Sequence, residues 1–477
     1  MRKLSSGTVI VPLIVACSLF MEQLDGSIIA TALPAIAHSL HADPLHLNLA
    51  ITSYMFSLAV FIPLSGWVAD RFGARTVFRS AIIVFTIGSV LCGFAQDMWG
   101  LVAARVVQGA GGAMMVPVGR LVMLRTVPRA ELVNAMAWLT TPALIGPVLG
   151  PPLGGLIVTY TSWRWIFFVN LPIGILGLIL ASIYIPNVRE KSREPLDLRG
   201  FLLMATALAG LVFGFETLGR DLMPEVATAG MLGAGILCLG LYFLHVRGIR
   251  HPIIDLGLTR YHTYRASITG GTLYRIGVGA LPFLLPMMFQ VGFGMSAARS
   301  GFLTFASAAG AVLMKMAAAP VIRRFGFKRV LVVNSFINVV FLAGCAFFSP
   351  ETWHIAIFTF LLIGGFFRSL QFTALNTLAY AEIPPGLISR ANTLYSMLQQ
   401  LALSLGVAVG ALLLNLTMAM KGSGHLGAWD FWPAYIAVGL LGVLSVPYFM
   451  SLPANAGEEM SGHAMPPPTP VRRGDPV

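Results

Sequence analysis

The feature that most constrains the fold is a series of long apolar runs separated by short loops, and the loops hold most of the charges. An apolar helix of about 20 residues crosses the hydrocarbon core of a bilayer. Only 10% of the residues are charged and 57% are hydrophobic, whereas about 25% are charged in soluble domains. Such a chain cannot cover a soluble globule, so the runs predict an all-α membrane protein. Fourteen spans are predicted, with the approximate bounds 9–35, 47–68, 77–95, 101–123, 134–158, 165–185, 198–218, 227–246, 266–290, 300–320, 329–348, 353–372, 390–417 and 431–451.

The Lys and Arg residues are distributed unevenly between alternate loops, which indicates the orientation. With the N-terminus in the cytoplasm, the inner loops and the two tails hold about 22 cations and the outer loops hold about four. The positive-inside rule therefore predicts an even number of spans with both termini in the cytoplasm (N-in/C-in). The net charge of +12 is spread over short gaps rather than over one soluble face, which disfavours binding to nucleic acid.

One short repeat indicates two related halves. GWVADRFGAR (66–75) and APVIRRFGFK (319–328) both follow an apolar run and enter a predicted cytoplasmic loop. Transporters are often built from such repeats, with the binding site between them near the middle of the membrane. The predicted division is a six-helix bundle over 1–190, two additional helices with linkers over 191–262, a second six-helix bundle over 263–453, and a disordered cytoplasmic tail over 454–477.

Five motifs occur in order along the predicted spans: LDGSIIATALPAIA (24–37), GWVADRFGAR (66–75), LVAARVVQGAGGA (101–113), GPVLGPPLGG (146–155) and WRWIFFVNLPIG (163–174). Together they resemble motifs of the major facilitator superfamily, and in particular of its fourteen-span drug:proton antiporters. The resemblance covers about residues 10–452. It implies two six-helix bundles plus two extra central helices, transport by alternating access, and multidrug efflux driven by a proton gradient without a cofactor. It also implies a multi-pass protein of a bacterial cytoplasmic (inner) membrane.

The motif GWVADRFGAR has a physical interpretation beside the one that the resemblance implies. Its glycines permit a tight turn, and Asp70 is placed to cap a helix N-terminus, where the helix dipole favours a carboxylate. The start of the predicted span 13, near Ser389, is the candidate partner. The resemblance implies a conformational latch, whereas the alternative is a plain turn with positive-inside arginines. The latch residues are Gly66, Asp70, Arg71, Gly73 and Arg75.

The segment GPVLGPPLGG combines small residues with prolines. Small residues let helices approach closely, and proline kinks a helix. Helix packing alone explains the pattern, but the resemblance implies an antiporter motif whose packing governs opening and leakage. The residues concerned are Gly146, Pro147, Gly150, Pro151, Gly154 and Gly155.

Charged residues also lie inside the predicted spans. Each costs about 2.5–3.5 kcal/mol at mid-helix on insertion scales, so each should face the interior, pair, or extend to the membrane surface. Span 1 runs outward and span 4 runs inward, which places Asp25 and Arg105 at similar depths and predicts that they pair. The charged residues are Glu22, Asp25, Arg105, Arg120, Arg275, Lys315 and Arg368.

The predicted pair suggests a way to couple protons. Burial disfavours an ionised carboxylate and a nearby guanidinium favours it, so movement of Arg105 would let Asp25 gain and release a proton. We therefore expect Asp25 and Arg105 to carry proton coupling. Glu22, one turn away, is the alternative carrier, and a purely structural salt bridge is the other interpretation.

The intramembrane charges also bear on the substrate. The predicted spans contain five cationic residues and two acidic ones. This excess of positive charge favours an anionic or zwitterionic substrate, whereas a cavity for lipophilic cations should carry acids. The resemblance instead favours multidrug efflux of small amphiphilic compounds, and organic anions such as carboxylates or their metal chelates are the alternative. The amides of the predicted cavity would bind substrate or, equally, join helices. The predicted substrate-cavity residues are Arg275, Arg368, Gln371, Asn376 and Gln399.

Other classes of function lack their motifs. GAGGAM is not followed by Gly-Lys-Ser/Thr, so there is no P-loop, and GxSxG and HExxH do not occur. We therefore expect no enzyme activity, no metal site and no cofactor. A group of polar residues in the first outer loop is expected to be solvated rather than metal-binding: His38, His41, Asp43 and His46. The expected partners are a small-molecule substrate, protons and the lipid bilayer, and the sequence leaves open whether a periplasmic adaptor takes part. A non-transporting membrane receptor or scaffold is a further alternative.

Overall fold

The computed structural model describes residues 6–40, 44–187, 195–217, 223–249, 252–421 and 427–462, and within these ranges the chain is helical with no strand. Short 3-10 or π turns join several of the helices. The α-helices are α1 (Ser6–Leu40), α2 (Pro44–Phe61), α3 (Ser65–Phe72), α4 (Ala74–Phe94), α5 (Met98–Thr126), α6 (Leu132–Tyr160), α7 (Trp165–Phe168), α8 (Asn170–Tyr184), α9 (Leu198–Thr217), α10 (Glu225–Val246), α11 (His262–Gly279), α12 (Leu281–Met287), α13 (Ala297–Gly344), α14 (His354–Leu378), α15 (Ile388–Lys421), α16 (Trp432–Val443), α17 (Val446–Met450) and α18 (Glu458–Ser461).

Twelve helical stretches within the described residues are long and apolar enough to cross a membrane. One of them, Arg299–Phe347, contains most of α13. The 48 residues of α13 would extend about 72 Å at 1.5 Å per residue, more than twice the hydrocarbon thickness of about 30 Å. The helix is broken at Gly326, where φ is 72°, so its two arms are separate helices that match the predicted runs 300–320 and 329–348.

The repeat found in the sequence has a counterpart in the backbone. The RFG of the first copy ends at Gly73, which has φ of 91° between α3 and α4. The RFG of the second copy ends at Gly326, which lies between the two arms of α13. Both glycines have positive φ, which side chains disfavour, so the same turn chemistry joins two consecutive helices in each copy.

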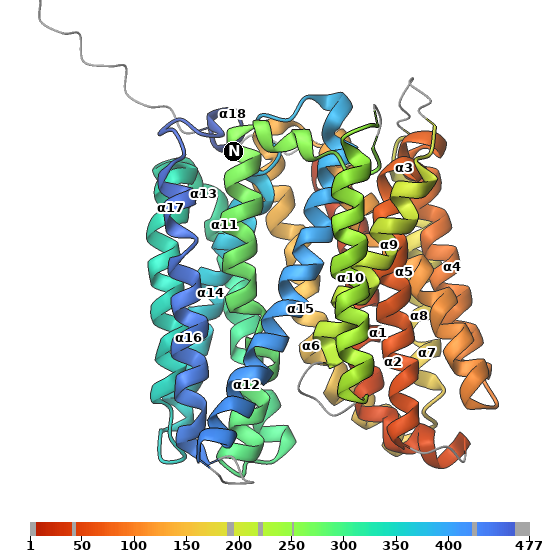
Figure 1. The fold of residues 1–477 in the computed structure, drawn as a ribbon, viewed down its shortest axis with the longest axis vertical. Helices are drawn as coiled ribbons and strands as arrows, with labels where there is room; N and C mark the ends of the chain where they lie inside the picture. Colours follow the sequence, from red (N-terminus) through yellow and green to blue (C-terminus); the bar gives the residue numbers. More distant parts are fainter. Residues whose placement is uncertain are drawn as a thin grey trace, which may run out of the picture.

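The helices form two groups that meet along one interface (Figure 1). We call α1–α8 the N-terminal group and α11–α17 the C-terminal group. Helix α6 packs against α13 and α14, and α15 packs against α3 and α5. Helix α9 packs against both α2 and α15, and α10 covers α9. The additional helices therefore contact both groups rather than extending one of them.

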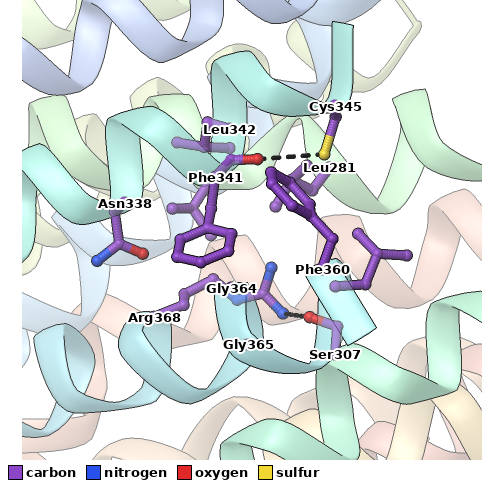
Figure 2. A pocket seen from close by; sticks show the side chains of 12 residues that line it. Leu281, Ser307, Asn338, Phe341, Leu342, Cys345, Phe360, Gly364, Gly365 and Arg368 are labelled. Carbon is purple, nitrogen blue, oxygen red and sulfur yellow. Dashed lines mark hydrogen bonds between the residues drawn. The ribbon is translucent and has the colours of Figure 1, made fainter. Parts of the chain in front are cut away.

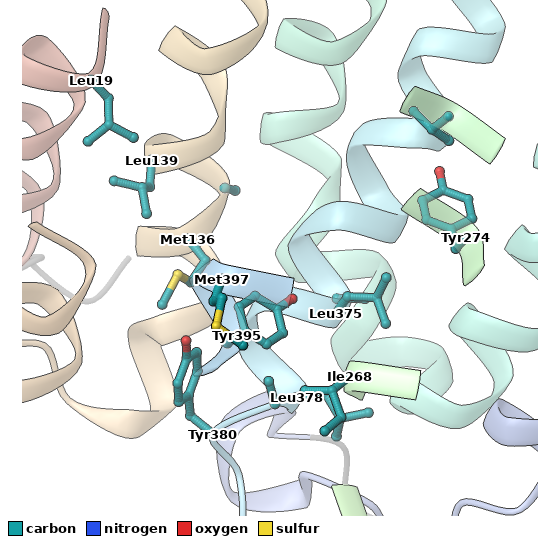
Figure 3. Close-up of a cluster of buried hydrophobic side chains, with 14 of the residues drawn as sticks. Leu19, Met136, Leu139, Ile268, Tyr274, Leu375, Leu378, Tyr380, Tyr395 and Met397 are labelled. Carbon is teal, nitrogen blue, oxygen red and sulfur yellow. The ribbon is translucent and has the colours of Figure 1, made fainter. Parts of the chain in front are cut away.

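Apolar packing joins the two groups near the interface (Figure 3). Met136 and Leu139 of α6 belong to the same buried cluster as Met397 of α15 and Leu375 of α14. On the outer surface, by contrast, large apolar side chains are exposed. On α10, Ile236, Leu237 and Leu244 are 62–63% exposed. A surface of this kind is suited to lipid rather than to water.

The C-terminal segment differs from its prediction. Residues 454–477 are predicted to be disordered, but the structure describes 454–462 as turns followed by α18. Ala456 and Met460 are buried, and α18 contacts α13, α6 and the short turn at Arg129–Glu131. The prediction failed because it rested on composition alone, and Pro and Gly are common in disordered segments. Here Gly457 and Gly462 adopt φ of 69° and 65° and turn the segment back onto the helices. Residues 463–477 lie outside the described part of the chain.

Candidate functional site

The predicted pair between Asp25 and Arg105 is present and completely buried. Arg105 Nη1 donates to Asp25 Oδ2 at 2.6 Å, and both side chains are 0% exposed. The other carboxylate oxygen, Oδ1, accepts from Gln108 Nε2 and from Asn170 Nδ2, both at 2.8 Å. One carboxylate of α1 is therefore held by donors from α5 and α8.

Further contacts fix the position of the arginine. Arg105 Nε donates to the carbonyl oxygen of Ala50 at 3.1 Å, and Nη1 also donates to Gln108 Oε1 at 2.7 Å. The guanidinium carbon lies 4.2 Å from the centroid of the Tyr54 ring, within the range of a cation–π contact. Arg105 Nη2 has no hydrogen-bond partner among the described residues. The charge is thus oriented by several weak partners and neutralised by one strong partner, Asp25.

Glu22 lies one helical turn before Asp25 and is also buried, at 7% exposure. Its Oε2 has no hydrogen-bond partner among the described residues. The two acids therefore differ: Asp25 accepts three hydrogen bonds, whereas Glu22 keeps a free oxygen in the same region. Two buried carboxylates so close in sequence, one bound and one unsatisfied, are unusual unless a proton or a ligand uses them.

The predicted antiporter motif packs directly against the acid-bearing helix. A Cβ added at Gly146 would lie 2.7 Å from Gln23 Cβ, and one at Gly150 would lie 2.8 Å from Ser27 Cβ. Ser27 Oγ also donates to the carbonyl oxygen of Gly146 at 3.2 Å. The small residues therefore bring α6 into close contact with α1 beside Glu22 and Asp25.

The other residues of this motif have different surroundings. Gly154 is buried, whereas Gly155 is exposed and has open space where a Cβ would lie. The side chains of Pro147 and Pro151 lie outside the described part of the structure. The same applies to the side chains of His38, His41, Asp43 and His46 in the first outer loop.

The predicted latch differs from the structure in the partner of Asp70. Asp70 Oδ1 accepts from Arg125 Nη2 of α5 at 2.6 Å rather than capping α15. The contact with α15 is made by Gly66, whose carbonyl oxygen accepts from Ser389 Oγ at 3.0 Å. The prediction failed because α3 presents its glycine face to α15, which leaves the carboxylate beside α5 in its own group.

The remaining latch residues lie within the N-terminal group. Arg71 is exposed, Gly73 forms the turn described above, and Arg75 Nη1 donates to the carbonyl oxygen of Ile185 at 3.3 Å. A Cβ at Gly66 would collide with the Thr393 hydroxyl and lie 3.0 Å from Ser389 Oγ, so only glycine permits this approach. Gly66 is therefore the member of the motif that makes the contact between groups.

Hydrogen bonds between the two groups gather toward one end of the molecule, the end at which α3 and α18 lie in Figure 1. We call this the α3 end. Asn392 Nδ2 donates to the carbonyl oxygen of Pro117 at 2.6 Å. Arg129 donates to the carbonyl oxygens of Ala381 and Ile383 at 3.2 and 3.4 Å, and also binds Glu459 at 3.1 Å. The two groups are thus closed against each other at the α3 end.

Part of the predicted substrate cavity lies beside this interface. Arg275 donates to Asn376 Oδ1 at 3.3 Å and also to the hydroxyl of Tyr395. Tyr395 in turn donates to Asn376 Oδ1 at 2.7 Å. From the other group, Arg120 donates to Gln399 Oε1 at 3.2 Å, and its guanidinium carbon lies 5.3 Å from the Tyr395 ring. Arg275, Asn376 and Gln399 therefore belong to one cluster that α5 completes.

The other two predicted cavity residues lie elsewhere. Gln371 binds Asn334 at 2.9 Å and Ser335 at 2.9 Å, so it joins α14 to the second arm of α13. Arg368 donates to the hydroxyl of Ser307, on the first arm of α13. The five residues do not share one cavity, because Gln371 and Arg368 face the interior of the C-terminal group.

Several residues of these clusters were missed by sequence reasoning as functional candidates. Asn170 is a single amide in the apolar motif WRWIFFVNLPIG, and that isolation was the available signal. Tyr395 carried no signal, because a tyrosine is common at interfaces and in cores. For Arg120 the sequence left open whether it faces the interior, pairs or extends to the membrane surface; it is 3% exposed and bridges the groups.

A bundle of apolar helices in two groups, with buried charges at and near their interface, is the architecture of a membrane transporter. The sequence profile described as Major Facilitator Superfamily matches residues 15–407. The putative multidrug resistance protein MdtD of Escherichia coli O6:H1 is 38% identical over 441 residues, which cover 92% of this chain and 93% of that protein. The protein of the same name from Shigella sonnei is 38% identical over 442 residues, with the same coverage.

Solved structures show the same fold at low sequence identity. The human organic anion transporter MFSD10 (TETRAN) superposes with a TM-score of 0.68 at 15% identity, covering 93% of this chain and 99% of that one. The proton:xylose symporter XylE superposes with a TM-score of 0.64 at 14% identity, covering 96% and 99%. The chain belongs to the Major Facilitator Superfamily. It is a transporter and not an enzyme.

Proposed function

We propose that the protein is a proton-coupled exporter of small amphiphilic compounds, of the multidrug-efflux type, in a bacterial cytoplasmic membrane. The relatives named as multidrug resistance proteins support the substrate class, since the similarity extends over nine-tenths of both chains. The observation that carries the proposal is the buried Asp25–Arg105 pair with its amide donors. Its energy source is the proton gradient, without a bound cofactor.

The proposed topology has fourteen spans with both termini in the cytoplasm. The twelve candidate spans count the two arms of α13 as one and do not include α6, whose 29 residues are mostly apolar. With the arms counted separately and α6 added, the number is fourteen. The distribution of Lys and Arg supports the orientation, and it makes the α3 end cytoplasmic. The proposed domains are those of the sequence division, 1–190, 191–262 and 263–453, with a tail whose first residues are ordered.

In this orientation the structure corresponds to a transporter closed toward the cytoplasm. For the carrier to take up a proton at Asp25, at least one of its three donors must move away, because a carboxyl oxygen that carries a proton no longer accepts in the same way. Arg105 is the donor whose displacement also removes a charge. Movement of α5 relative to α1 between access states would therefore link substrate release to proton uptake.

A second candidate, export of organic anions such as carboxylates or their metal chelates, is favoured by one observation. Arg120, Arg275 and Lys315 are 1–7% exposed near the interface, and none has a carboxylate partner among the described residues. Lys315 instead lies 4.6 Å from the ring centroid of Trp138. Buried cations of this kind suit an anionic or zwitterionic substrate.

The test uses inverted membrane vesicles that contain the protein. Cationic dyes and organic acids are screened for uptake with and without an imposed proton gradient, and the Asp25→Asn protein is the control. Uptake that needs both the gradient and Asp25 supports a proton-coupled exporter, and the accepted substrate class decides between the two candidates. If the protein inserts normally but neither class accumulates under a gradient, the proposal is wrong and a receptor or scaffold is favoured.

A further inference from the structure

A small cavity lies inside the C-terminal group (Figure 2), whereas the Asp25–Arg105 cluster lies in the N-terminal group. Its volume is about 20 Å³, and its walls come from α11, α12, α13, α14 and the short turn at Cys345–Phe347 that follows α13. A cavity needs about 10–15 Å³ to hold one water molecule. The space therefore admits one water molecule or one monatomic ion, and it excludes a drug-sized substrate.

The cavity wall carries one charge, that of Arg368. Along α14, Arg368 lies about 21 Å from His354 and about 15 Å from Leu378 at 1.5 Å per residue, which is near the middle of the bilayer. A cation at this depth is costly unless it is neutralised. Yet the residues that line the cavity include no Asp or Glu, and Arg368 has no carboxylate partner among the described residues.

The other polar groups of the wall do not supply the missing charge. Asn338 is neutral, and its amide has partners within the protein. Its Nδ2 donates to the carbonyl oxygen of Asn334 at 2.8 Å, and its Oδ1 accepts from Tyr274 at 3.2 Å. Cys345 Sγ donates to the carbonyl oxygen of Phe341 at 3.2 Å. Only the Ser307 hydroxyl accepts from Arg368, and a hydroxyl is neutral.

The aromatic part of the wall also suits an anion. Phe341 and Phe360 also line the cavity (Figure 2), and their ring centroids lie 4.8 Å apart with planes tilted by 56°. Aromatic edges carry partial positive charge, so a tilted pair can present an edge to an anion. A water molecule would satisfy a hydrogen bond here but would leave the guanidinium charge uncompensated.

We propose that this cavity binds a monatomic anion of the halide class, chloride in the cell, as the counter-ion of Arg368. The small volume favours a monatomic ion over a larger anion such as phosphate, and the part-buried guanidinium of Arg368 supplies the attraction. The site is independent of the proton-coupling cluster, which lies in the other group of helices. The ion neutralises the centre of the C-terminal group, so its binding should raise the stability of the folded protein.

The experiment measures thermal unfolding of the full chain in lipid nanodiscs by tryptophan fluorescence. Chloride or bromide is titrated against gluconate at constant ionic strength, because gluconate is too large for the cavity. We expect a saturable rise of about 3 °C in Tm with either halide, since a ligand that binds only the folded state stabilises it. Replacing an exposed arginine in the matched control Arg324→Gln should leave this rise unchanged.

Two variants separate an anion site from a merely structural arginine. Arg368→Gln should unfold at the same temperature in halide and in gluconate. Ser307→Asp places a carboxylate beside the guanidinium, so it should lose the halide dependence while remaining at least as stable in gluconate as the wild type in saturating chloride. The second variant keeps the test informative if Arg368→Gln fails to fold.

Direct detection completes the test. An anomalous diffraction peak from bromide beside Arg368 supports the proposal, and water alone in that position overturns it. Equal Tm values in chloride and gluconate for the wild type overturn it as well. So does a halide effect that persists in Ser307→Asp, since the ion would then bind elsewhere.

Discussion

The two acids of α1 are close in sequence but have different partners. Asp25 accepts hydrogen bonds from Arg105, Gln108 and Asn170, whereas Glu22 Oε2 has no partner among the described residues. A carboxylate with an arginine that can leave and return is suited to exchange a proton in each cycle. The second acid has a buried oxygen without a hydrogen-bond partner among the described residues, so we expect it to meet the substrate when the two groups move apart.

Replacing each acid by its amide should therefore give different results. Asp25→Asn should reduce gradient-driven transport at least about tenfold for every substrate, because the proposed proton carrier is lost. Glu22→Gln should keep proton-driven transport of some substrates and change apparent affinity more than maximal rate. Transport of several compounds in proteoliposomes, with proton movement followed by a pH-sensitive dye, measures both quantities. Full coupling in Asp25→Asn would assign the proton to another group.

The pair between Asp25 and Arg105 could be predicted from sequence because depth in the membrane follows from position along a span. Asn170 could not, because one amide in an apolar run does not indicate which neighbour it faces. The partner of Asp70 was also beyond prediction. It depends on which face α3 turns toward α15, and that is decided by the close approach at Gly66 rather than by charge.

At the scale of helices, the contact between α1 and α6 depends on two glycines. A Cβ at Gly150 would lie 2.8 Å from Ser27 Cβ and 3.0 Å from the backbone nitrogen of Ile28, so α6 would have to move away from α1. Gly155, on the same helix, has open space where an added Cβ would lie.

Gly150→Ala should therefore lower stability by about 1–3 kcal/mol, as overpacked sites do, and should impair transport or cause leakage of the gradient. Gly155→Ala is the matched control, with the same chemical change on the same helix and no steric conflict. Thermal unfolding and passive proton leak in proteoliposomes distinguish the two variants. Similar behaviour of both would show that helix propensity, and not packing on α1, explains the motif.

The C-terminal segment 454–462 is a second element whose contribution can be isolated. Removal of all residues after Pro453 would expose the surface that Ala456 and Met460 cover on α13, α6 and the Arg129–Glu131 turn. We expect a loss of about 1–3 kcal/mol from the exposed apolar area. The exposed pair between Arg129 and Glu459 should add little to this loss.

Truncation after Gly462 is the appropriate control, because it keeps α18 and removes only residues outside the described part of the chain. Thermal unfolding of the two truncated proteins in the same nanodiscs makes the comparison. Equal Tm values for both would mean that the segment does not stabilise the closed interface.

For the whole molecule, the two groups of helices contact each other through hydrogen bonds at the α3 end. Asn392→Ala removes the donor to the Pro117 carbonyl, a bond of 2.6 Å. One lost hydrogen bond of about 1 kcal/mol should shift the balance of closed and open states about fivefold toward opening at this end. Leu412→Ala, on the exposed face of the same helix, is the control.

Spin labels at Phe72 and Gly386, in a background that lacks the four native cysteines, report this opening as longer distances. A distance distribution that is unchanged by Asn392→Ala would show that the bond follows closure without contributing to it.

The two-group architecture itself was predictable, because the apolar runs, the loop charges and the RFG repeat all indicate it. The position of α9 between α2 and α15 was not, because no charge or motif identifies its neighbours.

The bonds across the α3 end share a chemical feature. Ser389, Asn392 and Arg129 all donate to backbone carbonyl oxygens of the opposite group. A carbonyl oxygen released at an aqueous surface is hydrated at once, so opening exchanges each protein bond for a bond to water of similar strength. The closure is therefore reversible by hydration, and conditions that lower water activity, such as high concentrations of an excluded osmolyte, should slow its opening.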